Sequence, residues 1–171
     1  MRMKYLMSGL VLLGLGVGGV FWYWQHTQRS AQENRRTLSR VVPQTEDAWR
    51  GKLSPEAYAI LREGGTEKPF SSPLNAEKRP GTYVAADTGI PVFRSEDKFD
   101  SGTGWPSFTQ PIRPEAVIER PDNSLFTERT EILSTAGGHL GHVFKDGPPP
   151  TGRRYCMNGA ALRFIPDEKG K

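Results

Sequence analysis

The sequence predicts a mainly β domain that is preceded by one N-terminal transmembrane helix. Two observations carry this fold class. Residues 5–24 form an apolar run of twenty residues without a formal charge, which at about 1.5 Å per residue spans a hydrocarbon core of about 30 Å. From residue 82 onward short apolar runs alternate with turns, and the chain holds 14 prolines and 19 glycines. That pattern is typical of an all-β domain.

The amino-terminal quarter of the chain divides into three parts. Residues 1–4 form a short basic tail, residues 5–24 a transmembrane anchor and residues 25–45 a polar linker. A cleaved signal peptide is the alternative, but no small-x-small cleavage site follows the apolar run. Basic residues before the run favour a cytoplasmic amino terminus. We expect a single-pass membrane protein with its folded domain on the periplasmic or extracytoplasmic side, although a mitochondrial or plastid membrane fits the same pattern.

The distribution of charge separates the anchor from the rest of the chain. Residues 1–42 hold six of the 23 basic residues and one of the 19 acidic residues, which leaves 17 basic and 18 acidic residues in the remainder. This near-neutral part has no basic run interleaved with aromatic residues, so a nucleic-acid partner is not expected. Residues 46–168 are enough for one domain with a single core.

One short helix is expected ahead of the strands. Ser54 can cap it, Pro55 suits its first position and Gly64 follows its end. Turns are expected at residues 87–89 and 121–123. Strands are expected where apolar, β-branched and aromatic residues lie between turn residues. They cover residues 82–85, 92–93, 116–119, 125–133, 139–144, 153–157 and 162–165.

Cys156 is the only cysteine and lies in a segment that suits a strand. In an extended chain Arg154, Cys156 and Asn158 share one face, while Tyr155 and Met157 point to the other, into a core. A guanidinium beside a thiol favours the nucleophilic thiolate. The alternative is that Cys156 is a small buried hydrophobe, as most free cysteines are.

Two of the three histidines lie upstream, in a segment that also suits a strand. A separation of three would place His139 and His142 on opposite faces of a regular strand, but a bulge at Gly141 would turn both toward one cleft. The HxxH spacing is weak evidence for a metal, and no CxxC pair or nearby third ligand supports one. A catalytic Cys/His pair competes with the simpler interpretation of one core and one surface histidine.

Three motifs together resemble a known family. FRSEDKFDSGTGWPSF, HLGHVFKDG and RYCMNGAALRF, in this order and at this spacing, resemble the B-type methionine sulfoxide reductases, which reduce the R epimer of methionine sulfoxide. The resemblance runs from about Trp49 to about Pro166. It implies two antiparallel sheets with short peripheral helices and an active site on the open face of one sheet.

The resemblance also implies roles for the central residues. Cys156 matches the nucleophile that attacks the sulfoxide sulfur. His142 and His139 match the imidazoles around the substrate oxygen, which must leave with a proton. Arg154 and Asn158 match positions flanking the cysteine, where they would stabilise the thiolate and orient the substrate.

Three further positions are implied by the same motifs. Asp146 matches an acidic position that we expect to orient an imidazole. Trp105 matches the indole that packs against the methyl group of the substrate, and Phe108 of the same motif is expected to bind substrate with it. An apolar wall beside proton donors would select one sulfoxide epimer, because the other would place methyl and oxygen in the wrong surroundings.

The chain departs from the family in two ways. Many members bind a structural zinc through two CxxC pairs, at positions that here read Ala85, Thr88, Leu133 and Ala136; no metal is therefore expected. Many members also carry a resolving cysteine where this chain has Thr103. The resemblance then implies that Cys156 becomes a sulfenic acid that an external thiol must reduce.

The expected partners follow from these implications. They are proteins that contain methionine sulfoxide and a reductant, either thioredoxin or glutaredoxin with glutathione, with no bound cofactor. We expect a monomer. Two alternatives are a Cys/His hydrolase and a non-catalytic anchored module that binds oxidised methionine.

Overall fold

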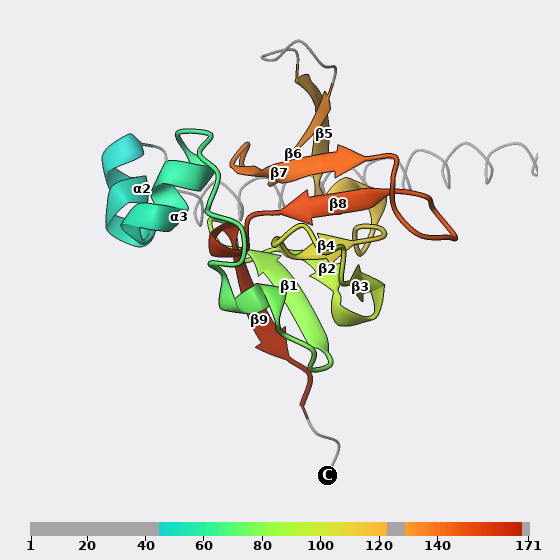
Figure 1. The fold of residues 1–171 in the computed structure, drawn as a ribbon. Helices are drawn as coiled ribbons and strands as arrows, with labels where there is room; N and C mark the ends of the chain where they lie inside the picture. Colours follow the sequence, from blue (N-terminus) through green and yellow to red (C-terminus); the bar gives the residue numbers. More distant parts are fainter. Residues whose placement is uncertain (1–44, 123–128, 169–171) are drawn as a thin grey trace, which may run out of the picture. The chain divides into compact units, whose positions relative to one another are not determined.

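The computed structural model describes residues 45–122 and 129–168 (Figure 1). These residues belong to one compact unit, Val42–Lys171. The predicted tail and anchor, and all of the predicted linker except residue 45, lie outside the described residues. Among the residues that are described, no helix has both the length and the apolar character needed to cross a membrane.

Two short helices precede the strands. The first, α2 (Glu46–Lys52), is capped by the side chain of Thr45 and buries Trp49. The second, α3 (Pro55–Leu61), begins with the predicted signals, because the Ser54 hydroxyl accepts a hydrogen bond from the Ala57 backbone nitrogen at 3.2 Å. The predicted capping and first-turn proline are thus confirmed.

The strands form two antiparallel sheets, which confirms the expected mainly β architecture. The three-stranded sheet has the order β2-β1-β9, and the six-stranded sheet has the order β3-β4-β8-β7-β6-β5. Their bounds are β1 (Gly81–Ala85), β2 (Pro91–Arg94), β3 (Lys98–Phe99), β4 (Ser107–Phe108), β5 (Ile118–Asp122), β6 (Arg129–Leu133), β7 (His139–Phe144), β8 (Arg154–Met157) and β9 (Leu162–Pro166).

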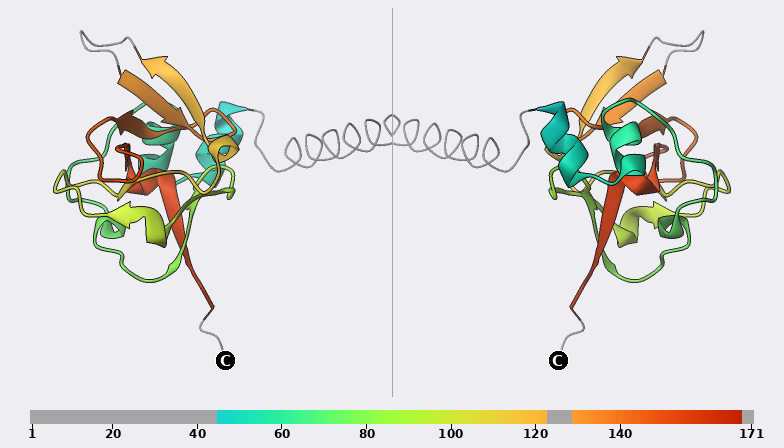
Figure 2. Two further views of the ribbon diagram at one scale, coloured as in Figure 1. Left: turned by 90° about the vertical axis from the view of Figure 1, so that its right-hand side faces the viewer. Right: turned by 90° about the vertical axis from the view of Figure 1, so that its left-hand side faces the viewer.

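Single turns of 3-10 helix lie between these helices and strands; they are η1 (Pro73–Asn75), η2 (Ser95–Asp97), η3 (Pro114–Ala116) and η4 (Gly159–Ala161). The β5–β6 hairpin and strand β9 extend in opposite directions from the centre of the domain, as both views in Figure 2 show.

The prediction of a turn at residues 121–123 is wrong. Pro121 and Asp122 continue β5 and pair with Thr130 and Arg129 of β6. The proline is tolerated because β5 is the edge strand of the six-stranded sheet, where a residue without an N–H breaks no ladder. The strand expected at 116–119 accordingly starts two residues later, after η3.

An aromatic cluster joins the two sheets. Phe93 of β2 stacks on Phe108 of β4 with ring centroids 4.4 Å apart, and Tyr83 of β1 meets Phe108 edge-on at 4.9 Å. Tyr155 of β8 packs against Phe93 at 5.8 Å. All four side chains are almost completely buried. Their packing therefore fixes how the six-stranded sheet lies against the three-stranded sheet.

Candidate active site

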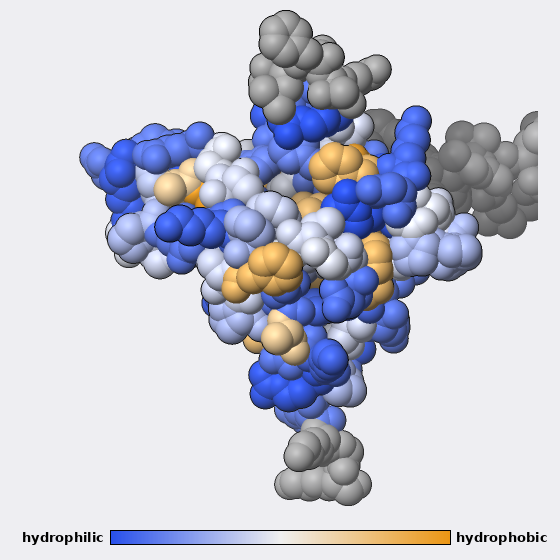
Figure 3. Space-filling model, in the orientation of Figure 1, coloured by the Kyte–Doolittle hydropathy of each residue, from blue (hydrophilic) through white to orange (hydrophobic). Residues whose placement is uncertain are grey.

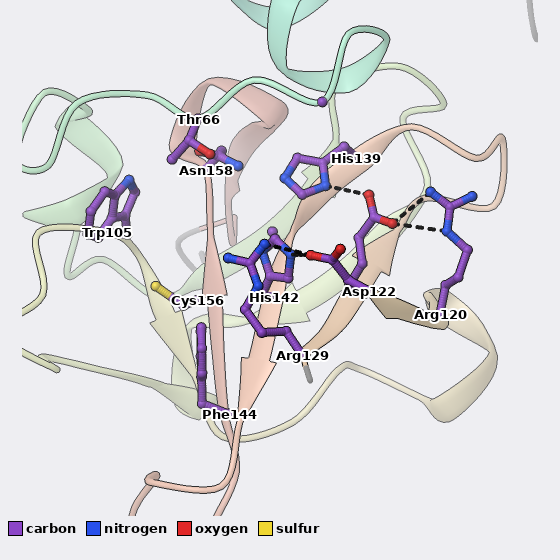
Figure 4. Close-up of a pocket in the computed structure, with 13 residues that line it drawn as sticks. Thr66, Trp105, Arg120, Asp122, Arg129, His139, His142, Phe144, Cys156 and Asn158 are labelled. Carbon is purple, nitrogen blue, oxygen red and sulfur yellow. Dashed lines mark hydrogen bonds and ion pairs between the residues drawn. The ribbon is translucent and has the colours of Figure 1, made fainter. Parts of the chain in front are cut away.

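Strand β8 places Cys156 as the sequence predicts. Tyr155 and Met157 are only 2% and 0% exposed and point into the core, whereas Arg154 and Cys156 lie on the other face. That face carries a cavity of about 470 Å³ lined by residues of four strands and of the segments around them (Figure 4). Figure 3 shows that the face of the domain with β7 and β8 in front mixes apolar and polar side chains.

The lining of this cavity holds most of the predicted site. The residues come from the segment after α3, from the loop before β4 and from β5, β6, β7, β8 and the position after β8. They are Gly64, Thr66, Trp105, Arg120, Asp122, Arg129, Glu131, His139, Gly141, His142, Phe144, Cys156 and Asn158.

The surroundings of the Cys156 thiol act in two directions. Burial raises its pKa, and this effect outweighs the opposing effects of the Thr103 hydroxyl, the Arg154 charge and the Ser107 hydroxyl. Thr103 Oγ1 lies 3.8 Å from Sγ. The predicted action of Arg154 is therefore present, but in the free protein it does not bring the pKa of the thiol below its ordinary value.

Arg154 is held by two partners. Its guanidinium donates two hydrogen bonds of 2.9 Å to the Asp146 carboxylate and lies 4.4 Å from the centre of the Phe144 ring. The hydrogen bond from Arg154 lowers the pKa of Asp146. Asp146 therefore orients the guanidinium, and the expectation that it orients an imidazole is corrected, because its described partner is Arg154.

A β-bulge brings the two histidines together, which confirms the prediction from the sequence. Ile132 of β6 pairs with Gly141, but the next residue, Leu133, pairs with His139, so Leu140 is the extra residue of β7. Gly141 has φ 157°, and a Cβ atom there would collide with the carbonyl oxygen of Cys156. The imidazole rings consequently lie 5.3 Å apart.

His139 is the more deeply buried of the two imidazoles. Its Nδ1 lies 2.7 Å from Glu131 Oε1, and Glu131 Oε2 accepts hydrogen bonds from Arg120 at 2.7 and 3.0 Å. Burial lowers the pKa of His139, although Glu131 acts in the opposite direction. Burial alone would raise the pKa of Glu131, but its bonds to Arg120 and His139 leave that pKa lowered.

His142 has a parallel set of partners. Its Nε2 lies 2.9 Å from Asp122 Oδ2, which also accepts a 2.6 Å hydrogen bond from Arg129 Nη2. Figure 4 shows both imidazoles at the cavity, with Asp122 beside His142. A carboxylate on one ring nitrogen fixes the orientation of an imidazole, and both imidazoles line the cavity.

The sequence did not identify Asp122 or Glu131. Asp122 stood in a Pro-Asp-Asn segment that resembles a turn, and Glu131 stood in a strand whose neighbours were unknown. One signal was available in the sequence, because Asp122 and Glu131 stand on either side of a short segment just before the strand that carries the histidines. Only the pairing of β5, β6 and β7 places their side chains beside the imidazoles.

Asn158 holds the bulge in place. Its Nδ2 and its backbone nitrogen both donate to the carbonyl oxygen of Leu140, at 3.2 and 2.8 Å, and its Oδ1 accepts from the Glu67 backbone nitrogen at 3.1 Å. Asn158 is 3% exposed. Its amide therefore lines the cavity and also ties β7 to the segment that follows α3.

The apolar wall of the cavity differs in part from the prediction. Trp105 lines the cavity as expected, and its Nε1 donates to the Glu67 carbonyl oxygen at 3.2 Å. Phe108 is fully buried in the aromatic core, so its expected contact with substrate is wrong. Phe144, which the sequence did not suggest, lines the cavity instead.

The positions that match the zinc ligands of the resembled family lie at the ends of β1 and β6 and in the turns that follow, and a buried hydrogen bond connects these two segments. Ser134 Oγ donates to Asp87 Oδ2 at 2.5 Å, and both side chains are fully buried between residues 85–88 and 133–136. Over the described part of the chain no group of three or more His, Cys, Asp or Glu residues is arranged to hold a metal. That the protein binds no metal stays a prediction.

Comparison with known proteins agrees with this geometry. The SelR domain matches residues 53–166. Peptide methionine sulfoxide reductase MsrB of Bradyrhizobium diazoefficiens is 52% identical over 132 residues, which cover 77% of this chain and 95% of that protein. MsrB of Methanosarcina barkeri is 47% identical over 133 residues, 77% of this chain and 94% of that protein. The chain therefore belongs to the family of B-type methionine sulfoxide reductases.

Proposed function

We propose that Cys156 carries out the reduction of methionine-R-sulfoxide by attacking the sulfoxide sulfur. The observation that carries this proposal is that the only cysteine of the chain shares one cavity with both strand histidines and Trp105. In the balanced step the thiolate, the sulfoxide and one proton give methionine and a sulfenic acid on Cys156. The cysteine is oxidised by two electrons and the substrate sulfur is reduced by two.

The proton that the oxygen needs would come from the two imidazoles. Each ring has one nitrogen beside a carboxylate, at 2.7 Å for His139 and 2.9 Å for His142. In the protonated ring the other nitrogen also carries an N–H, which would donate to the substrate oxygen. The Glu131 carboxylate favours the charged form of His139, so it would help this imidazole act as a general acid.

Selectivity for the R epimer would come from the division of the cavity into two parts. Trp105 and Phe144 offer apolar surface to the methyl group, and His139, His142 and Asn158 offer hydrogen-bonding groups to the oxygen. Exchange of methyl and oxygen leaves polar groups unpaired, at a cost of about 1–3 kcal/mol for each.

Recycling would need a thiol from outside the chain. The sulfenic acid reacts with one external thiol to give a mixed disulfide and water, and a second thiol then releases Cys156 as a free thiol. Thioredoxin, or glutaredoxin with glutathione, is the reductant class we propose, with no bound cofactor. The substrates are oxidised proteins.

The remaining features of the proposal rest on the sequence. Residues 46–168 would form the catalytic domain of a monomer, joined by the 25–45 linker to the 5–24 anchor, and would lie on the periplasmic or extracytoplasmic side. Cell fractionation of the full chain beside a chain that starts at residue 43 tests the anchor. Recovery of both in the soluble fraction would contradict it.

The chemistry is tested with a peptide that carries separated R and S epimers of methionine sulfoxide. The full chain and Cys156→Ser are each incubated with excess dithiothreitol, and the methionine formed is measured. We expect reduction of the R epimer alone, and none by the variant. Reduction by Cys156→Ser at the wild-type rate would remove Cys156 from the mechanism.

A further inference from the structure

Three hydroxyl groups form a hydrogen-bonded chain beside the Cys156 thiol. Thr103 Oγ1 lies 3.8 Å from Sγ, Ser101 Oγ lies 2.8 Å from Thr103 Oγ1, and Ser107 Oγ lies 2.7 Å from Ser101 Oγ. Ser107 is fully buried and stands directly opposite Cys156 in the β4–β8 pair. We call Thr103, Ser101 and Ser107 the hydroxyl chain.

The hydroxyl chain can serve the sulfur as either donor or acceptor. If Ser107 donates to the Trp105 carbonyl oxygen, at 3.1 Å, then Ser101 donates to Ser107, Thr103 donates to Ser101, and Thr103 Oγ1 accepts from the sulfur group. If Ser107 donates to Ser101 instead, its bond to the Trp105 carbonyl oxygen is lost, both bonds within the hydroxyl chain reverse, and Thr103 donates toward the sulfur. Each hydroxyl has one proton and two acceptor sites, so both directions are satisfied.

These two directions match the two forms of an oxidised cysteine. A sulfenic acid has an O–H that donates, and a sulfenate has only an oxygen that accepts. In a chain with one cysteine, no internal disulfide removes the sulfenic acid before a second oxidation makes it irreversible.

We propose that the hydroxyl chain holds the oxidised Cys156 and slows its conversion to sulfinic acid until an external thiol arrives. This inference rests on the sulfenic acid of the proposed function. In the competing step a sulfenate and hydrogen peroxide give a sulfinate and water, as the sulfenate sulfur supplies the electron pair and breaks the peroxide bond. A hydrogen bond from Thr103 to the sulfenate draws electron density from that sulfur and makes it a weaker nucleophile. Thr103 is then a positioning residue for the oxidised state.

The test compares variants of the full chain. Thr103→Val keeps the shape and removes the hydroxyl, Thr103→Ser restores it, and Thr109→Val is the control because the Thr109 hydroxyl bonds to Asp97. Each protein receives one equivalent of the peptide R-sulfoxide without thiol. Hydrogen peroxide is then added, and mass spectrometry follows the sulfenic acid, trapped with dimedone, and the sulfinic acid of Cys156 with time.

We expect Thr103→Val to form sulfinic acid about three to ten times faster than the wild type, the equivalent of one hydrogen bond. Thr103→Ser and Thr109→Val should behave as the wild type. Ser101→Ala, which interrupts the hydroxyl chain at its centre, should also accelerate the reaction. Equal or slower rates in both Thr103→Val and Ser101→Ala would overturn the inference.

The first step separates the two proposals. If the wild type produces neither methionine nor a trapped sulfenic acid from the first equivalent, the proposed function itself fails, and the inference about the hydroxyl chain fails with it. If both are produced and all four variants form sulfinic acid at the wild-type rate, only the inference about the hydroxyl chain fails.

Discussion

Charge and burial oppose each other at Cys156. Burial raises the pKa of the thiol, while the hydroxyl of Thr103 and the charge of Arg154 lower it without cancelling the effect of burial. Arg154 can act in this way because Asp146 and Phe144 hold its guanidinium on both sides. Arg154 therefore supplies the charge that favours the thiolate, while the Thr103 hydroxyl acts in the same direction and burial opposes both.

Substitution of Arg154 by methionine tests this dependence. The variant loses the positive charge and keeps an unbranched apolar side chain, so the pKa of Cys156 should rise further. The pH midpoint of alkylation of Cys156 by iodoacetamide should then move to higher pH. Arg163→Met, on the exposed face of β9, is the matched control. A midpoint that moves equally in both variants would show that the local charge of Arg154 is not responsible.

Burial and a neighbouring charge also oppose each other at His139. Burial lowers this pKa and the Glu131 carboxylate raises it. Glu131→Gln removes the charge, so the pKa should fall further and the protonated form should be lost at lower pH. Because a general acid must be protonated, the limb of kcat/KM that falls with rising pH should move to lower pH.

At neutral pH we expect kcat/KM of Glu131→Gln to drop by at least about tenfold, a part of the roughly 10²–10⁴-fold that a general acid contributes. An NMR titration of the imidazole checks the pKa itself. Glu115→Gln, on the exposed turn η3, serves as the control. An unchanged pH profile in Glu131→Gln would rule out His139 as the acid.

At the scale of elements, the bulge of β7 decides whether a site exists. A regular strand would place His139 and His142 on opposite faces, and the single extra residue Leu140 returns both to the cavity. Asn158 donates twice to the Leu140 carbonyl oxygen. The bulge is therefore fixed by the residue that directly follows β8, the strand that carries the cysteine.

Gly141→Ala tests the bulge directly. The new Cβ would overlap the Cys156 carbonyl oxygen, so strands β7 and β8 must separate, at a cost of about 1–3 kcal/mol for overpacking. Denaturant unfolding measures this cost, and kcat/KM per folded protein should fall with it. Gly51→Ala in α2 is the control, since its Cβ meets nothing within 4 Å and alanine favours a helix. Wild-type stability and activity in Gly141→Ala would contradict the role of the bulge.

Local patterns predicted part of this site, and strand pairing decided the rest. The alternation around Cys156 and the bulge at Gly141 depend on neighbours in sequence, so both were predictable. Phe108 was misplaced because β4 has only two residues, and its direction follows from its partner. It stands opposite Tyr155, whereas Ser107 stands opposite Cys156. Residues directly opposite in an antiparallel pair share a face, so Phe108 must join Tyr155 in the core.

At the scale of the whole domain, one aromatic cluster supports the site from behind. Tyr83 and Phe93 come from the three-stranded sheet, and Phe108 and Tyr155 from the six-stranded sheet. Cys156 lies on the opposite face of the same strand as Tyr155. The cluster thus stabilises the strands that carry the site without lining the cavity.

This separation of core and cavity predicts opposite behaviour for two aromatic residues. Phe108→Leu removes a stacked ring from a fully buried position and should lower the free energy of unfolding by roughly 1–3 kcal/mol. Below its unfolding transition, kcat/KM per folded molecule should stay near the wild-type value. Trp105→Leu removes the indole from the cavity wall, so it should lower kcat/KM and the ratio of R to S reduction while costing less stability. Denaturant unfolding and epimer-resolved kinetics on both variants check this. Loss of epimer selectivity in Phe108→Leu would contradict this separation. It would show that the core residue also shapes the cavity, because a shifted cavity wall no longer holds the methyl group and the oxygen of the substrate in separate surroundings.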